Sequence, residues 1–123
     1  MARFHIKVVM EKARHEHVLT VLPSNNGIDL EELGKILGEP VRFDTEEEFK
    51  WLFPDCGVDA IPPFGNLYGL PTLADSELSK NGYIVFTAGT PNDYMKLTYH
   101  TYERIVQPSR AAFSVKTGSR HSE

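Results

Sequence analysis

The sequence predicts an α+β domain in which helices flank a mixed, mostly antiparallel sheet. Three observations support this fold class. Apolar residues alternate with polar ones in several short segments, which is typical of half-buried strands. Other segments repeat apolar residues at helical spacing. The 123 residues suffice for one ordinary domain, and no repeat or internal linker divides them.

The first half of the chain contains predicted strands and two predicted helices. FHIKVVM at 4–10 alternates, and HVLTVLP at 17–23 is its expected antiparallel partner across a polar connection. SNNG at 24–27 predicts a turn, and apolar spacing predicts a helix over 28–37 that Gly38 and Pro40 end. Thr45 followed by Glu48 is a capping-box pattern for a second helix over 45–53, ended by Pro54.

The second half of the chain contains further strands and one short helix. LADSEL at 73–78 predicts a short strand and turn, while YIVFTAG at 83–89 and MKLTYH at 95–100 predict strands. TYERIV at 101–106 predicts one or two helical turns before Pro108. The predicted order is β-β-α-β-α-loop-β-β-β-α. We expect residues 1–113 to form the domain and the small, polar residues 114–123 to form a disordered tail.

Residues 54–71 combine many helix and strand breakers with apolar side chains. PDCGVDAIPPFGNLYGLP is too rich in proline and glycine for a regular element. Its apolar residues predict a packed, rigid loop. Such loops build binding sites, because glycine lets a ligand approach backbone N–H groups closely. A purely structural loop is the equally weighted alternative.

Composition excludes several classes of protein. The formal net charge is −4, which argues against a protein that coats nucleic acid through bulk charge. Nine acids lie within residues 29–55, so the basic N-terminal edge is the better place for RNA phosphates. No run of 18 apolar residues or secretory signal is present, and Cys56 is the only cysteine. A cytoplasmic protein without a membrane span is the simplest expectation.

The usual catalytic motifs are not found in the sequence. His15 and His17 have no HExxH spacing, so no metal site is predicted. There is no GxSxG elbow, no GxGxxG and no P-loop. Cys56 is a conceivable nucleophile without an evident base. Lys7 is either a solvated strand lysine or, beside an apolar loop, a group that holds an anion.

Several blocks in order resemble the YbaK-like domain, an aminoacyl-tRNA deacylase family also found inserted in or associated with prolyl-tRNA synthetase. The blocks are the strand with Lys7, the Leu22-Pro23 turn, the helix from Asp29 to Gly38, PPFGNLYGLP at 62–71, and IVFTAGTPNDYMKLTYHTYERIVQP at 84–108. The likeness covers about residues 4–108. It implies a barrel-like form of the sheet and a single domain.

The resemblance also implies an activity that serves translation fidelity. That activity is hydrolysis of the ester joining a wrong amino acid to a tRNA 3′ end, assisted by the substrate's own ribose hydroxyl and without cofactor or metal. The acceptor end of aminoacyl-tRNA is the implied partner, with an aminoacyl-tRNA synthetase as a further one. Lys7 would contact the terminal nucleotide or the substrate. The implied substrate-binding residues are Asp59, Pro63, Phe64, Gly65 and Asn66, with Gly89 and Thr90 on the opposite wall.

Three departures from the family pattern keep other functions open. Asp59 stands where the family's GxxxP motif has glycine, and Pro91 stands where the closest-looking branch has histidine. Few residues precede Lys7, whereas the family usually has a helical segment there. One alternative is a non-catalytic module that binds tRNA 3′ ends, aminoacyl groups or a protein partner. Another is a fragment completed by a second chain, as in a homodimer.

Overall fold

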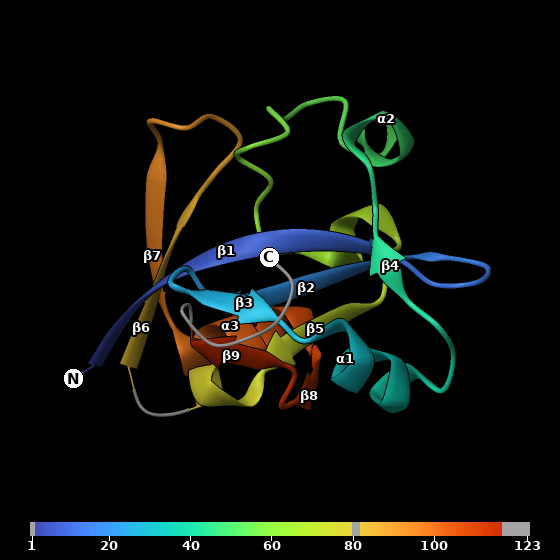
Figure 1. The fold of residues 1–123 in the computed structure, drawn as a ribbon. Coiled ribbons are helices and arrows are strands. Elements are labelled where there is room, and N and C mark those ends of the chain that lie inside the picture. Colours follow the sequence, from blue (N-terminus) through green and yellow to red (C-terminus); the bar gives the residue numbers. More distant parts are fainter. Residues whose placement is uncertain (1, 80–81, 117–123) are drawn as a thin grey trace.

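The structure, a computed structural model, describes residues 2–79 and 82–116 (Figure 1). The strands are β1 (Ala2–Lys12), β2 (His17–Pro23), β3 (Asn26–Ile28), β4 (Arg42–Phe43), β5 (Thr72–Asp75), β6 (Gly82–Thr87), β7 (Tyr94–Thr98), β8 (Ser109–Ala111) and β9 (Ser114–Lys116). The helices are α1 (Leu30–Leu37), α2 (Glu46–Phe49) and α3 (Tyr99–Val106), with 3₁₀ turns at Lys50–Leu52, Gly65–Tyr68 and Ser76–Ser79. None of these helices is long and apolar enough to cross a bilayer.

The strands form a mixed sheet in the order β7-β6-β1-β2-β5-β8, with β4 paired to the far end of β1. β1 is antiparallel to β2 and β4 and parallel to β6. β5 is parallel to both β2 and β8, whereas β6 and β7 are antiparallel. β3 and β9 form a separate antiparallel pair. The predicted α+β class with a mixed, mostly antiparallel sheet is confirmed.

Buried apolar side chains form two clusters, and β2 contributes to both because neighbouring strand residues point to opposite faces. Leu19 and Val21 belong to the larger cluster, whereas Val18 and Leu22 belong to the smaller one. Every residue of β2 except His17 is buried. Burial on both faces explains why this segment is apolar along its whole length rather than alternating.

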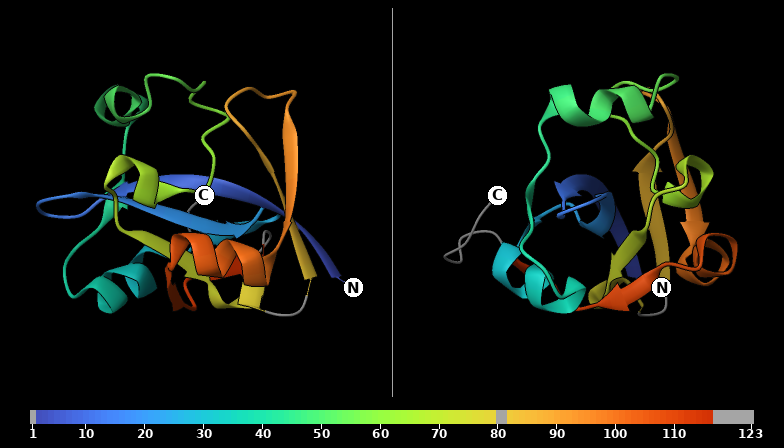
Figure 2. Two further views of the ribbon diagram at one scale, coloured as in Figure 1. Left: turned by 180° about the vertical axis from the view of Figure 1, so that it is seen from behind. Right: turned by 90° about the vertical axis from the view of Figure 1, so that its right-hand side faces the viewer.

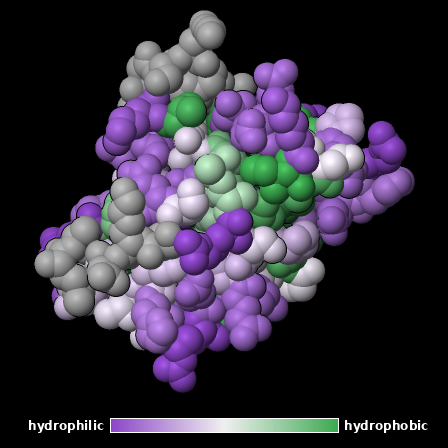
Figure 3. Space-filling view, turned by 90° about the horizontal axis from the view of Figure 1, so that it is seen from below, coloured by the Kyte–Doolittle hydropathy of each residue, from purple (hydrophilic) through white to green (hydrophobic). Residues whose placement is uncertain are grey.

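The helices cover different parts of this core. Leu33 of α1 belongs to the smaller cluster, and Tyr102 of α3 belongs to the larger. α2 lies at the opposite end of the molecule from α1 and α3 (Figures 1 and 2). Seen from below, where α1 lies, the surface is mainly hydrophilic around an apolar area (Figure 3). A shallow groove beside α1 is lined in part by Leu30 and Val41.

Both predicted helices in the first half are confirmed, with shifted ends. α1 begins at Leu30 because Ile28 pairs in β3, and the Asp29 side chain caps it by accepting from the Glu32 amide at 3.0 Å. Gly38 ends α1 with φ at 78°. The capping box of α2 is present, since Thr45 and Glu48 each accept from the other's amide, at 3.2 and 3.0 Å. α2 then continues as the 3₁₀ turn Lys50–Leu52.

Three sequence predictions are wrong at their boundaries. The strand over 95–100 ends at Thr98, because the Thr98 hydroxyl accepts from the Thr101 amide and caps α3. The turn at 24–27 gives way to β3 from Asn26. The disordered tail does not begin at 114, because Ser114–Lys116 pairs with Asn26–Ile28 through backbone hydrogen bonds. The rest of that predicted tail, 117–123, lies outside the described residues.

Candidate functional site

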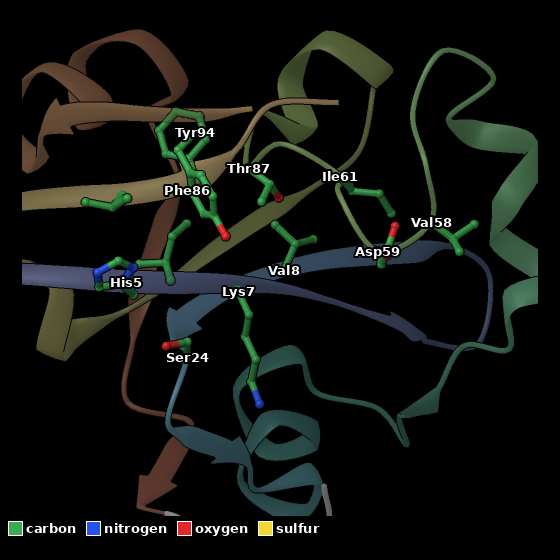
Figure 4. Close-up of a pocket in the computed structure, with 12 residues that line it drawn as sticks. His5, Lys7, Val8, Ser24, Val58, Asp59, Ile61, Phe86, Thr87 and Tyr94 are labelled. Carbon is green, nitrogen blue, oxygen red and sulfur yellow. The ribbon is translucent and has the colours of Figure 1, made fainter. Parts of the chain in front are cut away.

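A cavity of about 290 Å³ lies where the first half of β1 meets the end of β6 and the loop at 58–61 (Figure 4). Its lining consists of His5, Ile6, Lys7, Val8, Ser24, Val58, Asp59, Ile61, Val85, Phe86, Thr87 and Tyr94. Six of these residues are apolar and come from β1, the loop and β6, and the other six carry polar or charged groups. The cavity shares no lining residue with the groove beside α1.

Long-range pairing brings these segments together. The parallel register of β1 and β6 places His5 opposite Val85, and the antiparallel register of β6 and β7 places Thr87 opposite Tyr94. The loop is attached to the turn after β6 by two backbone hydrogen bonds. Gly57 donates to the Gly89 carbonyl at 3.1 Å, and Gly89 donates to the Ala60 carbonyl at 3.0 Å. Gly89 has φ at 98°, a conformation that favours glycine.

Lys7 borders the cavity from the middle of β1. Its side chain and that of Val8 leave the strand in opposite directions, as alternation requires (Figure 4). Val8 points toward Phe86 and Thr87, whereas the Lys7 amino group extends away from Asp59. Lys7, which the sequence singled out, thus lines the cavity, and its amino group lies toward one border.

Asp59 borders the same cavity from the loop. The Ala60 amide donates to the Gly57 carbonyl at 3.0 Å, so Val58 and Asp59 are the two central residues of a tight turn. The Asp59 carboxylate lies over Gly57, with Oδ1 only 3.1 Å from where a Cβ on Gly57 would be. Because Gly57 has no side chain, the Asp59 carboxylate has room to lie at this position.

Residues 63–66 support the cavity wall from behind rather than lining it. The Tyr102 hydroxyl donates to the Pro63 carbonyl at 2.7 Å. The Phe64 ring contacts those of Phe86 and Tyr102, with centroids 5.5 and 5.9 Å apart. Since Phe86 lines the cavity, Phe64 fixes that wall through the ring contact.

Gly65 and Asn66 do not line the cavity either. A Cβ on Gly65 would lie 2.1 Å from Thr72 Oγ1, so this glycine is required by packing. Asn66 is exposed. On the other side, Gly89 holds the loop by its backbone, and the Thr90 hydroxyl donates to Asp93. Of the residues singled out from the sequence, only Lys7 and Asp59 are part of the lining.

Sequence reasoning missed most of the lining. Tyr94, which is 64% exposed, and Val58, which is 37% exposed, stand at the rim. Phe86 and Thr87 could be placed on a strand but not at a site, because alternation gives no information about which strand lies opposite. The one available signal for Tyr94 is a large aromatic side chain at the exposed start of a strand.

Two other candidate groups lie elsewhere. Cys56 Sγ is 3.5 Å from the Tyr68 hydroxyl, and this hydrogen bond, together with burial, raises the pKa of Tyr68 to about 12. The Cys56 thiol therefore contacts a phenol rather than a base.

His17 Nδ1 is hydrogen-bonded to Asp44. Burial raises the pKa of the Asp44 carboxyl, and the hydrogen bond from His17 opposes this effect. Within residues 2–79 and 82–116, no three His, Cys, Asp or Glu side chains are arranged to hold a metal ion.

Fold and cavity together define a small α+β domain with a recessed candidate site beside its central strand. The sequence profile of the aminoacyl-tRNA editing domain matches residues 3–105. The chain belongs to this family, which confirms the YbaK-like resemblance. No protein with a curated description matches the chain significantly.

Solved structures show the same fold. A candidate trans-editing enzyme for prolyl-tRNA synthetase superposes with a TM-score of 0.79 at 22% identity, covering 89% of this chain and 69% of that one. A candidate signal transduction protein from Marinobacter aquaeolei VT8 superposes with a TM-score of 0.80 at 20% identity, covering 93% of this chain. The chain spans only 25% of the length of the latter protein.

Proposed function

We propose that the protein hydrolyses the ester bond between a wrong amino acid and the 3′ end of a tRNA. The observation that carries this proposal is the cavity itself. At about 290 Å³ it suits a small ligand, and its mixed lining of apolar side chains with Lys7 and Asp59 suits an amino-acid side chain joined to a nucleotide. Membership of the editing-domain family supports the same chemistry. The substrate implies action in the cytoplasm.

The chemistry that we infer is substrate-assisted. A water molecule attacks the ester carbonyl, the bond from that carbon to the ribose oxygen breaks, and the released ribose oxygen takes up a proton. The neighbouring ribose hydroxyl helps to position the water. Val8, Ile61 and Phe86 would exclude other water and thereby strengthen electrostatic stabilisation of the developing oxyanion. Lys7 would hold the terminal nucleotide.

Residues outside the lining act in this proposal by positioning the walls. Pro63, Phe64 and Gly65 would hold the Phe86 wall, with Asn66 on the exposed side of the same turn. Gly89 and Thr90 would hold the loop that carries Asp59. A rigid wall of this kind can exclude an amino acid that is too large, which is how a second sieve discriminates.

The test is release of amino acid from tRNA charged with alanine, cysteine or serine. We expect release from at least one of these, and a loss of about tenfold or more in Lys7→Ala. Lys35→Ala, on the exposed side of α1, is the matched control and should keep full activity. Absence of release from all three substrates would contradict the proposal, and equal release by Lys7→Ala would contradict the role of Lys7.

A second candidate function is binding of the aminoacyl end without hydrolysis, either alone or beside a synthetase. The observation that favours it is Asp59, a charged side chain where the family pattern has glycine. In that case charged tRNA binds and stays charged. Sedimentation at several concentrations tests the further expectation of a homodimer, which a strict monomer would contradict.

A further inference from the structure

The cavity carries opposite charges at different borders. Lys7 contributes a cation from β1, and Asp59 contributes a carboxylate from the loop. RNA is a polyanion, so a carboxylate at the mouth of an RNA-binding site repels most of the ligand. An aminoacyl ester has one group that a carboxylate attracts, namely the α-ammonium group beside the ester carbonyl. The charge arrangement therefore distinguishes the two ends of the substrate.

Asp59 has an exposed side chain on a backbone that is held in place. Its turn is closed by the hydrogen bond from Ala60 to Gly57, and both ends of that turn are bonded to Gly89. Gly57 leaves room for the carboxylate, because a Cβ there would lie 3.1 Å from Oδ1. A fixed backbone reduces the entropy lost when a ligand is bound.

We propose that the Asp59 carboxylate binds the α-ammonium group of the aminoacyl moiety. This proposal rests on the proposed function, because it assigns a substrate orientation to the same cavity. The nucleotide then lies toward Lys7 and Ser24, and the amino-acid side chain faces Val8 and Phe86 (Figure 4). The substrate class follows from this orientation. The site accepts aminoacyl esters with a free amine and rejects N-acylated ones, such as N-formylated or peptidyl esters.

The first test compares hydrolysis of a charged tRNA with that of the same tRNA after N-acetylation of its amino acid. We expect the wild type to prefer the free amine by about three- to tenfold in kcat/KM. Asp59→Asn keeps the shape and removes the charge, so the preference should disappear through KM while kcat changes little. Asp55→Asn is the control, since Asp55 is an exposed acid outside the cavity lining and should preserve the preference.

The second test needs no hydrolysis and separates this proposal from the proposed function. Adenosine carrying an amide-linked amino acid is titrated with the protein by calorimetry, beside its N-acetylated form. Asp59→Asn should weaken only the free-amine ligand, by about three- to tenfold.

The outcomes are distinct. If binding depends on Asp59 and the free amine but no tRNA is deacylated, the result supports the role of Asp59 and contradicts the hydrolytic function. If deacylation occurs and Asp59→Asn keeps the free-amine preference, the role of Asp59 is wrong. Absence of any difference between the free and acetylated ligands in the wild type also overturns it.

Discussion

Tyr102 shows how one buried hydroxyl positions a loop. Its ring is fully buried, and burial raises the pKa of the hydroxyl, so the group stays protonated and donates to the Pro63 carbonyl across the neutral range. Tyr99 lies beside it, with ring centroids 5.8 Å apart. The Tyr99 hydroxyl is also buried but has no hydrogen-bond partner among the described residues.

These two tyrosines make a matched pair for a stability measurement. Tyr102→Phe should lower the free energy of unfolding by about 1–3 kcal/mol, because it leaves the buried Pro63 carbonyl unsatisfied. Tyr99→Phe should cost much less, or even stabilise the protein, because it removes an unsatisfied buried group. Urea unfolding measures both. Equal losses would show that the Pro63 hydrogen bond contributes nothing.

At the residue scale, Lys7 and Asp59 were predictable as candidate site residues, and both border the cavity. The role of Gly65 was not, because glycine permits either a close ligand or close packing, and only the position of Thr72 shows that packing requires it here. The exposed Tyr94 was not predictable either, since its place at the cavity depends on its pairing with Thr87.

At the element scale, α2 depends on one carboxylate with two functions. Glu48 completes the capping box with Thr45. Its two carboxylate oxygens also accept hydrogen bonds from the two terminal nitrogens of the Arg42 guanidinium group, each at 2.8 Å. The Arg42 hydrogen bond, followed by the Thr45 amide, lowers the pKa of Glu48 well below its ordinary value of 4.5. The helix is only four residues long, so its end contacts are a large share of what holds it.

The stabilising effect of Glu48 should depend on pH. Because its pKa is lowered in the folded state, the unfolded chain takes up the proton first as the pH falls below about 4.5. The contribution is therefore present at pH 7 and shrinks below pH 4.5. Glu48→Gln should be less stable than the wild type at pH 7, with a difference that narrows toward pH 3 in urea unfolding.

Glu46→Gln is the control for this measurement, because Glu46 lies in the same turn and is exposed. It should show a smaller and less pH-dependent effect. A Glu48→Gln difference that stays constant between pH 7 and pH 3 would contradict the linkage.

At the scale of the whole molecule, β1 is the strand on which the sheet depends. It pairs with β2, β4 and β6, and Ile6 and Met10 lie in the larger core cluster. Amides of β1 and β2 should therefore exchange with solvent only on global unfolding, whereas those of α2 should exchange by local opening. Native-state hydrogen exchange measures this. Exchange of the central β1 amides as fast as those of α2 would contradict it.

Sequence patterns gave the elements but not their pairing. Alternation and capping signals depend on neighbouring residues, so the strands at 4–10 and 17–23 and the capping box at Thr45 were predictable. The pairing of β3 with β9 joins residues far apart in the chain, and both strands are short and polar enough to resemble a turn and a tail. The parallel pairing of β1 with β6 is equally remote, and it is this pairing that forms the cavity.

That remote pairing has a consequence during synthesis on the ribosome. Ala2 pairs with Gly82, so one edge of β1 stays unpaired until β6, about 80 residues further along the chain, has been synthesised. At synthesis rates of about 5–20 residues per second, this edge stays unpaired for roughly 4–16 s. During this time the nascent hairpin of β1 and β2 presents an open strand edge with Phe4 and Ile6 near it. The yield of folded protein in the cell should then depend on chaperones that shield this edge, even when the finished domain is stable.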